Sequence, residues 1–338
     1  MKVALFERPG HLNVTNLPLR PLQPGEALVR VRSCGICGTD VHIVEGTSRS
    51  SPPVVLGHEY AGVIEDVPQG ENSVKAGQAV AVDPNISCGT CFYCRRGLVH
   101  LCEKLRALGV DIDGGMAEFS IVPIRQLYRI PETLSPEAGA FIEPVSCAVH
   151  GIDKAGIRAG DAVVIVGGGT IGLIMLQLAR LCGAATVIVA EPLEGKRRIA
   201  LELGVDDAID PAGRDLKAAV LDRCGAGADV VIECAGRPET VRTAVSLARR
   251  GGTVELFGVC PKDSTVQIEP HEIYFRELTI VGSYINPNTF SRAAALLESG
   301  KVRIDRFQID RYPIEGVLAA LDRQREGRTI KCIIQPNA

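Results

Sequence analysis

The stretch AVVIVGGGTIGLIMLQLARLC (162–182) decides the fold of this chain. A short β-branched run precedes three glycines, and a leucine-rich segment follows them, so the order predicts a strand, a tight turn and a helix. Residues 162–179 carry no charge and are long enough to suggest a membrane helix, but the three glycines would interrupt it. We therefore expect no membrane span.

The glycines fit the G-x-G-x-x-G pattern in the context that makes it informative, after a strand and at the start of a helix. Gly167 allows a tight turn, Gly169 lets a pyrophosphate approach the backbone, and Gly172 lets the helix pack closely. Thr170 and Ile171 complete the loop. Free amides at the helix N-terminus favour phosphate, so the loop predicts a dinucleotide site of the Rossmann type.

Glu191 lies at the end of the next predicted strand, 185–192, and is expected to determine the preference for NAD or NADP. An acid at this place hydrogen-bonds the ribose hydroxyls and repels a 2′-phosphate, which favours NAD over NADP. Lys196, Arg197 and Arg198 point the other way, because a nearby cation tolerates the phosphate. NAD is the prediction and NADP the alternative.

Working outward, the length of 338 residues favours two domains. The first 150 residues read as β-rich and turn-broken, with strands at 27–34 and 61–67. From about residue 160 strands and helices alternate, which is typical of an α/β fold with a doubly wound parallel sheet. The alternation continues through strand-like and helix-like runs at 228–236, 240–249, 252–258 and 278–283.

The composition argues against nucleic-acid binding and against a secreted, disulfide-bonded protein. A net charge of −3 and a pI near 6.1 give no basic footprint for nucleic acid. The start, MKVALFERPG, lacks the apolar core of a signal peptide. The 12 cysteines are therefore expected to be reduced thiols and metal ligands in a cytoplasmic protein, and not a disulfide framework.

Four of these cysteines form a compact set in one segment. Their spacing is C-x2-C-x2-C-x7-C, and the residues are Cys88, Cys91, Cys94 and Cys102. Four thiolates complete a tetrahedral zinc shell and leave no position for substrate. The set predicts a structural zinc lobe at 84–104.

A second ligand set is spread over the chain. Cys37 belongs to Cys37-Gly38-Thr39-Asp40, His58 and Glu59 follow Gly57, and Glu143 precedes a proline. A catalytic zinc uses three protein ligands and keeps a fourth position open, and cysteine, histidine and carboxylate are suitable donors. Together with the glycine loop, these residues predict a reactive zinc near a hydride cofactor.

The order of these motifs resembles the zinc-dependent medium-chain alcohol dehydrogenases over essentially the whole chain. The pattern is most similar to the polyol (sorbitol- and arabinitol-type) dehydrogenases, because Glu143 stands where other alcohol dehydrogenases have a cysteine ligand. The resemblance implies a β-rich GroES-like catalytic domain, residues 1–150 and 286–338, around an inserted Rossmann domain, 151–285. It also implies two zinc ions per chain and a homotetramer or homodimer.

The resemblance assigns roles to individual residues. Cys37 and His58 bind the catalytic zinc, and one of Glu59 and Glu143 is the third ligand while the other partners the water on the metal. The sequence leaves open which one coordinates directly. Thr39 receives the substrate proton and His42 passes it to solvent through the cofactor ribose. Ile171, Glu191 and Lys196 align with cofactor contacts, and the nicotinamide half is expected beside Phe257, Gly258, Val259, Ser283, Tyr284 and Ile285.

The implied activity is the reversible oxidation of a secondary alcohol, foremost a sugar alcohol, to the ketone. The sorbitol dehydrogenases' substrate-binding Arg-Tyr pair is replaced here by Ile285-Asn286, which speaks against sorbitol itself. L-threonine 3-dehydrogenase, or another small alcohol or diol dehydrogenase, is the alternative. A zinc-containing protein that only senses NAD(H) is the alternative of another class. A zinc-free quinone or enoyl reductase is disfavoured, because those enzymes lack the Cys37–His58–Glu59 set.

Overall fold

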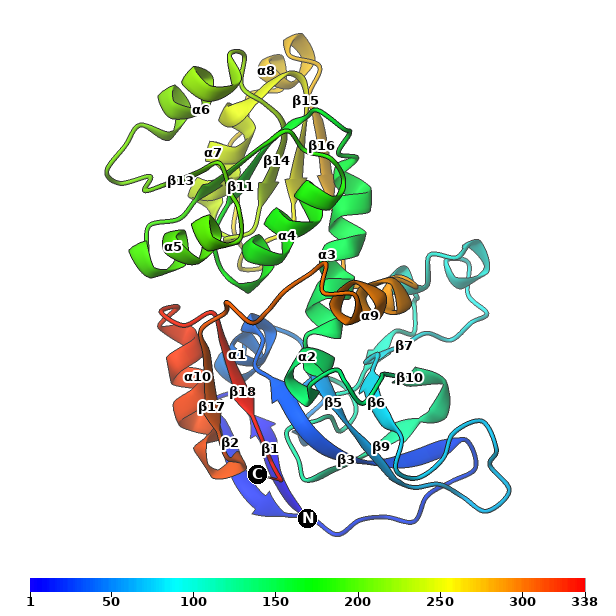
Figure 1. Cartoon of the computed structure of the whole chain (residues 1–338). Coiled ribbons are helices and arrows are strands. Elements are labelled where there is room, and N and C mark those ends of the chain that lie inside the picture. Colours follow the sequence, from blue (N-terminus) through cyan, green and yellow to red (C-terminus); the bar gives the residue numbers. More distant parts are fainter. Residues whose placement is uncertain (338) are drawn as a thin grey trace. The chain divides into compact units, whose positions relative to one another are not determined.

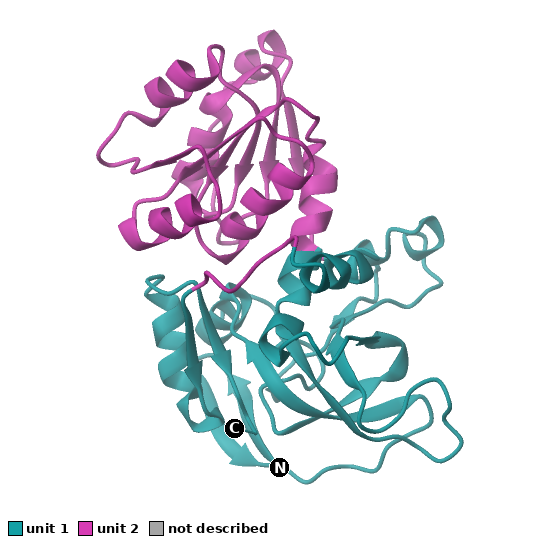
Figure 2. Ribbon diagram, in the orientation of Figure 1, with its two compact units in different colours: residues 1–146, 286–300, 308–338 teal, residues 147–285, 301–307 magenta. Residues whose placement is uncertain are grey.

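The computed structural model describes residues 1–337, which form two compact units (Figures 1 and 2). Unit 1 contains Met1–Ser146, Asn286–Gly300 and Gln308–Ala338, and unit 2 contains Cys147–Ile285 and Lys301–Phe307. Across residues 1–337 no helix is both long and apolar enough to cross a membrane.

Unit 2 is built on a six-stranded parallel sheet of order β13-β12-β11-β14-β15-β16. The chain moves outward from β11 in one direction and then in the other, which is the doubly wound arrangement with helices on both faces. The strands are β11 Ala162–Val166, β12 Thr186–Ala190, β13 Asp207–Ile209, β14 Ala228–Glu233, β15 Ala248–Leu256 and β16 Thr279–Gly282. The helices are α4 Thr170–Leu181, α5 Glu194–Glu202, α6 Leu216–Cys224, α7 Pro238–Leu247 and α8 Pro270–Phe275, and α3 Ile142–Ala155 runs across the unit boundary.

Unit 1 is β-rich. Its main sheet has the order β10-β6-β5-β3-β18-β17, with β9 also paired to β3, and a smaller sheet has the order β2-β1-β4. The strands are β1 Lys2–Arg8, β2 His11–Asn16, β3 Glu26–Gly35, β4 Val54–Val55, β5 Glu59–Asp66, β6 Ala79–Val82, β7 Asn85–Ile86, β8 Arg106–Ala107, β9 Phe119–Pro123, β10 Leu127–Arg129, β17 Ile309–Tyr312 and β18 Lys331–Ile334. The helices are α1 Gly38–Glu45, α2 Pro136–Ala140, α9 Phe290–Glu298 and α10 Val317–Arg325.

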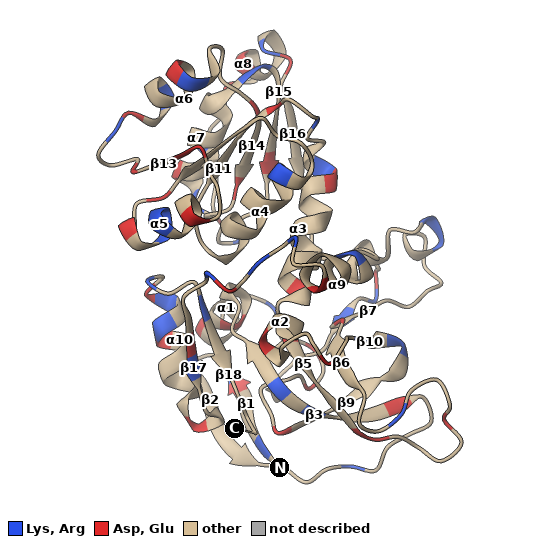
Figure 3. Ribbon diagram, viewed as in Figure 1, with Lys and Arg blue, Asp and Glu red and all other residues tan. Residues whose placement is uncertain are grey.

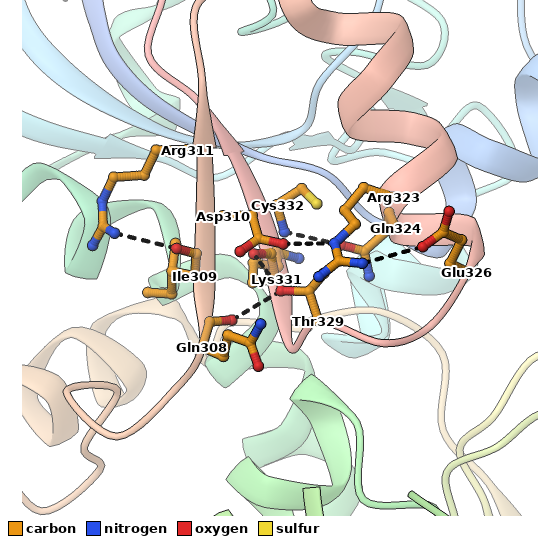
Figure 4. Close-up of polar contacts among 10 residues, drawn as sticks. All are labelled: Gln308, Ile309, Asp310, Arg311, Arg323, Gln324, Glu326, Thr329, Lys331 and Cys332. Atoms are coloured by element: carbon orange, nitrogen blue, oxygen red, sulfur yellow. Dashed lines mark hydrogen bonds and ion pairs between the residues drawn. The ribbon is translucent and has the colours of Figure 1, made fainter. Parts of the chain in front are cut away.

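The C-terminal segment completes the main sheet of unit 1. Polar contacts hold it together: Arg323 Nε donates to Asp310 Oδ2 at 2.8 Å, and Cys332 N donates to Gln324 Oε1 at 3.0 Å (Figure 4). The strand β18 then pairs with β3 in antiparallel register, with Ile333 opposite Gly35. Strand β18, near the end of the chain, is thereby placed beside its first long strand.

The units differ from the expected domains at two places. Residues 147–150 belong to unit 2, so the boundary falls within α3 after Ser146 and not at residue 150. Residues 301–307 also belong to unit 2 rather than to the catalytic part. The Gln177 amide explains this, since it donates to Arg303 O at 3.1 Å and accepts from Arg303 N at 2.8 Å.

Unit 2 contains a fully buried acid, Glu255 on β15. Ser283 Oγ donates to its Oε1 at 2.9 Å, while Oε2 has no hydrogen-bond partner among the described residues. Burial raises the pKa of Glu255 to about 8, although the Ser283 hydroxyl and the charge of Lys154 lower it. A Cβ on Gly151 of α3 would lie 2.6 Å from Oε1, so the helix backbone packs closely against this carboxylate.

Glu255 should make the stability of the protein depend on pH. The folded state keeps the proton up to about pH 8, whereas the unfolded chain releases it near pH 4.3. The contribution of Glu255 to stability therefore falls as pH rises through that window, by about 1.4 kcal/mol per unit at most. Glu255→Gln should flatten the decline of the thermal unfolding midpoint between pH 5 and 9.

The exposed Glu202→Gln on α5 serves as the matched control and should leave the pH profile unchanged. An identical profile for wild type and Glu255→Gln would contradict the assignment of the buried proton to Glu255.

Candidate metal centres and cofactor loop

Three potential metal ligands meet at the edge of β3 and β5 in unit 1. Cys37 is the N-cap of α1, directly after β3, and its amide donates to Asp40 Oδ2 at 2.8 Å. Glu59 opens β5 opposite Gly35, with His58 just before it. The ligand atoms of Cys37, His58 and Glu59 all lie within 4.8 Å of one another.

The group has the chemistry of a catalytic zinc site. His58 and Glu59 are buried, at 8% and 2% exposure, and one thiol, one imidazole and one carboxylate leave a fourth position open. His58 Nδ1 lies 3.6 Å from Asp40 Oδ1, and neither atom has a hydrogen-bond partner within residues 1–337. Burial would lower the pKa of His58, but Asp40 and Cys37 raise it well above its ordinary value. Such a concentration of negative groups around an imidazole fits a bound cation.

Lys331 joins this site from the other end of the chain, and motif spacing gave no sign of it. It is the first residue of β18, 3% exposed, and its Nζ forms an ion pair with Glu59 Oε2. Burial lowers the pKa of Lys331, but Glu59 and Cys37 outweigh that effect and raise it. The ammonium group therefore stays charged beside the cluster.

The expected proton-relay residues lie on α1. Cys37 Sγ is 3.6 Å from Thr39 Oγ1, which places that hydroxyl next to the three-residue group. His42 lies one turn further along with an exposed side chain, and its Nδ1 contacts Thr47 Oγ1 at 3.3 Å. Thr39 and His42 thus occupy positions that a proton could use in passing along α1 from the three-residue group to solvent.

Glu143 is placed less directly. It lies in the first turn of α3 and is buried, and its backbone carbonyl accepts from Ser146 Oγ at 2.7 Å. It is not a member of the group formed by Cys37, His58 and Glu59. Of the two carboxylates, Glu59 is therefore the better candidate for a direct metal ligand in this structure. The role of Glu143 as a second carboxylate of the site stays a prediction.

The four cysteines of the lobe form a second group within 4.8 Å, between β7 and β8. Backbone amides point at their sulfurs: Cys88 N donates to Cys102 Sγ at 3.2 Å and Cys91 N to Cys88 Sγ at 3.4 Å. Backbone hydrogen bonds from Thr90 and Cys91 lower the pKa of Cys88 to about 6. Amides directed at sulfur favour the thiolate that zinc binds.

The glycine loop has the expected conformation. Gly167 has a φ of 106° after β11, and a Cβ on Gly172 would collide with Gly167 O, so both positions require glycine. The same Cβ would lie 3.4 Å from Cγ2 of Ile165 on β11, so Gly172 closes the loop and also allows the close helix–sheet packing that the motif predicts. Gly169 caps α4, and a Cβ there would meet no atom within 4 Å, which leaves the helix N-terminus open to a phosphate.

Glu191 is fixed at the end of β12 by backbone amides. Its Oε2 accepts from Gly168 N at 2.8 Å and its Oε1 from Leu193 N at 2.9 Å. Arg197 is engaged with backbone oxygens, donating to Glu191 O at 2.8 Å and to Pro192 O at 2.6 Å. Burial lowers the pKa of Lys196, although the charge of Glu191 opposes this. The carboxylate is thus held rigidly next to the loop.

The segments expected at the nicotinamide half follow β15 and β16. Phe257 N and Gly258 N donate to Glu233 O at 3.0 and 2.8 Å, and Val259 is 78% exposed. Ser283 is bound to Glu255, as described above. Tyr284 is exposed, and Ile285 has a φ of 44°, a strained conformation for a β-branched residue.

Asn286, which takes the place of a substrate-binding residue in the sorbitol dehydrogenases, is 3% exposed in unit 1. Asn85 Nδ2 donates to its Oδ1 at 2.5 Å, and its own Nδ2 donates to Asp83 Oδ1 at 3.2 Å. Burial raises the pKa of Asp83 to about 6, against the hydrogen bonds from Asn85 and Asn286. Asn286 is therefore committed to a structural network.

Comparisons with known proteins agree with this picture. Residues 23–132 match the family model described as the alcohol dehydrogenase GroES-like domain, and residues 170–299 match that of the zinc-binding dehydrogenases. D-arabinitol dehydrogenase 1 of Uromyces fabae is 34% identical over 341 residues, covering 100% of this chain and 97% of that protein. L-threonine 3-dehydrogenase of Pyrococcus horikoshii is 35% identical over 318 residues, covering 92% of this chain and 91% of that protein.

Solved structures are also similar over nearly the whole chain. A zinc-binding dehydrogenase of Sinorhizobium meliloti 1021, bound to NADP, superposes with a TM-score of 0.95 at 43% identity, covering 99% of both chains. An alcohol dehydrogenase of Escherichia coli CFT073, complexed with NADH, gives a TM-score of 0.91 at 30% identity with the same coverage of both chains.

Loss of one lobe cysteine should destabilise the protein without touching the glycine loop. Cys91→Ala should remove one zinc per chain and lower the thermal unfolding midpoint by about 5 °C or more, because a structural zinc contributes folding free energy directly. Metal analysis and thermal unfolding measure both effects. Cys260→Ala, outside the two clusters, is the control and should keep both values. A Cys91→Ala protein with full zinc content and unchanged stability would disprove the structural role.

Proposed function

Because the chain belongs to the zinc-dependent medium-chain alcohol dehydrogenase family, close to its polyol dehydrogenases, we propose that it is an NAD-dependent enzyme that reversibly oxidises a secondary alcohol of a polyol to the ketone. The observation that carries this proposal is the group formed by Cys37, which is partly buried, and the buried His58 and Glu59. A protein that only sensed NAD(H) would have no use for buried mixed donors outside the cysteine lobe.

Cys37 and His58 would hold the catalytic zinc, with Glu59 or Glu143 as third ligand, and Cys88, Cys91, Cys94 and Cys102 would hold the structural one. The catalytic zinc, when bound, supplies a Lewis acid that polarises the substrate oxygen. The protein residues orient the alcohol and keep bulk water from the buried donors.

The chain provides its own route for the alcohol proton. Thr39 lies next to Cys37, so its hydroxyl is placed to accept the proton from the substrate. His42 is exposed and bonded to Thr47, and it would deliver the proton to solvent. An imidazole ring carries both a donor and an acceptor nitrogen, which suits this exchange with water.

Glu191 supports NAD as the cofactor. Its two oxygens are held by backbone amides, so the carboxylate cannot swing away from a 2′-phosphate. Arg197, one of the three nearby cations, is occupied by backbone oxygens. The related structure that contains NADP makes NADP the alternative to test.

A sugar alcohol is the substrate class we favour, and L-threonine is the second candidate. Both types of enzyme occur among relatives at similar identity, 34% for a D-arabinitol dehydrogenase and 35% for an L-threonine 3-dehydrogenase. The former match extends over 100% of this chain and the latter over 92%. A polyol offers several hydroxyls to a site rich in carboxylates, which favours the first.

We also propose that the chain forms a homodimer or homotetramer. The strand β16 is an edge of the parallel sheet in unit 2, and Tyr274 and Phe275 of the neighbouring α8 are exposed. An unpaired edge strand with apolar neighbours is suited to pairing with its own copy. No nucleic acid is expected as partner.

Cys37→Ser should separate the two zinc sites. Zinc content should fall from two ions per chain toward one, and kcat/KM should fall about 100-fold or more, because metal polarisation contributes several kcal/mol to the transition state. Metal analysis and steady-state kinetics on the folded variant test this. A folded Cys37→Ser protein with one zinc and normal alcohol oxidation would refute the proposed site.

A substrate panel tests the activity itself. NADH formation should be fastest with pentitols and hexitols, slower with simple secondary alcohols and diols, and at least tenfold slower with NADP than with NAD, as the fixed carboxylate of Glu191 predicts. Preference for L-threonine would support the second candidate. No turnover of any alcohol, with two zinc ions bound, would favour an NAD(H)-binding protein without dehydrogenase activity.

A further inference from the structure

The buried ammonium of Lys331 has a defined structural support. Hydrogen bonds fix the chain on both sides of Lys331. On the N-terminal side Thr329 Oγ1 donates to Gln308 O at 3.1 Å, and on the C-terminal side Cys332 N donates to Gln324 Oε1 at 3.0 Å (Figure 4). Lys331 N itself donates to Gln308 O at 3.3 Å. Its side chain passes Gly35, where a Cβ would lie 2.8 Å from Lys331 Cε and would collide with Glu59 Oε2.

Isolating a lysine from water is costly. Removing an ammonium from water costs several kcal/mol, and a well-packed apolar residue at the same place is often no less stable. Fold stability alone therefore gives no reason for a cation here, whereas the partner of the cation, Glu59, belongs to the metal-ligand group.

The charges around the site give such a reason. When Cys37 binds metal as a thiolate, it adds to the carboxylates of Glu59 and Asp40, which makes three anions. With His58 neutral as a metal ligand, Lys331 is the one lysine or arginine paired with this set among residues 1–337. Two negative charges remain, and a divalent cation neutralises them. Without Lys331 the third anion would be left without a cation of its own and would compete for the metal.

We propose that Lys331 is a positioning residue of the catalytic metal site: it holds Oε2 of Glu59 and so prevents this carboxylate from binding the metal with both oxygens. The inference rests on the proposed function of Cys37, His58 and Glu59 as a zinc site. It adds that the C-terminal strand determines how Glu59 coordinates, and hence whether a position on the metal stays open for the alcohol.

The loss of Lys331 should change metal affinity in the direction opposite to the usual one. Loss of a buried side chain next to a metal site normally weakens metal binding, but loss of Lys331 should strengthen it. A neutral residue at 331 removes a repulsive positive charge and frees the second oxygen of Glu59, and both changes favour the metal. Turnover should fall, because Glu59 then occupies the position that the substrate needs.

The test compares zinc-loaded Lys331→Met with wild type. A chelator should remove the zinc bound by Cys37, His58 and Glu59, called here the labile zinc, about 10- to 100-fold more slowly. This is the size typical of changes to residues that support metal ligands. The kcat should fall about tenfold or more. With Co²⁺ in the labile site, the visible absorption should weaken, as it does when coordination rises above four. The thermal midpoint should depend more strongly on the labile metal than in wild type.

Two further variants control the comparison. Lys331→Arg keeps the charge and should release zinc as fast as wild type or faster. Lys2→Met removes the lysine of an exposed ion pair with Glu315 and should change nothing at the metal. Faster zinc release from Lys331→Met, an unchanged Co²⁺ spectrum, or a chain that fails to fold even when metal-loaded would each overturn the proposal.

The outcomes also separate this inference from the function on which it rests. Wild-type protein that binds only one zinc would refute the catalytic site itself. Wild-type protein with two zinc ions and normal turnover, whose zinc release does not slow in Lys331→Met, would refute the role of Lys331 alone.

Discussion

The candidate active site depends on one backbone position, Gly35, where β3 pairs with two neighbours. Glu59 of β5 lies opposite it on one side and Ile333 of β18 on the other. Without a Cβ at Gly35, the Glu59 carboxylate and the Lys331 chain can approach each other across the strand. Cys37 follows two residues later at the start of α1. Three distant parts of the sequence are thus brought together by hydrogen bonding of a single strand.

The two cysteine-containing groups differ in the way their charges are balanced. The lobe group directs backbone amides at its sulfurs, so neutral donors stabilise the thiolates. The mixed group uses whole charges, with Asp40 beside His58 and Lys331 beside Glu59. This contrast follows from the contacts and not from the identity of the ligands alone.

The local parts of this organisation could be predicted from the sequence. The glycine loop and the alternation after residue 160 depend on turn chemistry and short-range periodicity, and the doubly wound sheet appears as expected. Contacts between distant segments could not be predicted in this way. Nothing in the spacing around Lys331 or Gln177 indicates that they contact Glu59 and Arg303. Glu255 did leave a signal, since an acid within the apolar strand run GTVELFG (252–258) is a candidate for burial.

The network of Asn286 has a consequence for changing the substrate range of this protein. In the sorbitol dehydrogenases that the chain resembles, the corresponding residue contacts the substrate. Here Asn286 hydrogen-bonds Asn85, three residues before the first lobe cysteine, and the buried Asp83. An engineer who restored the tyrosine at 286 would strip Asp83 of a donor and disturb the base of the lobe. Substitutions at exposed positions outside this network would leave the buried hydrogen bonds of Asp83 and Asn85 in place.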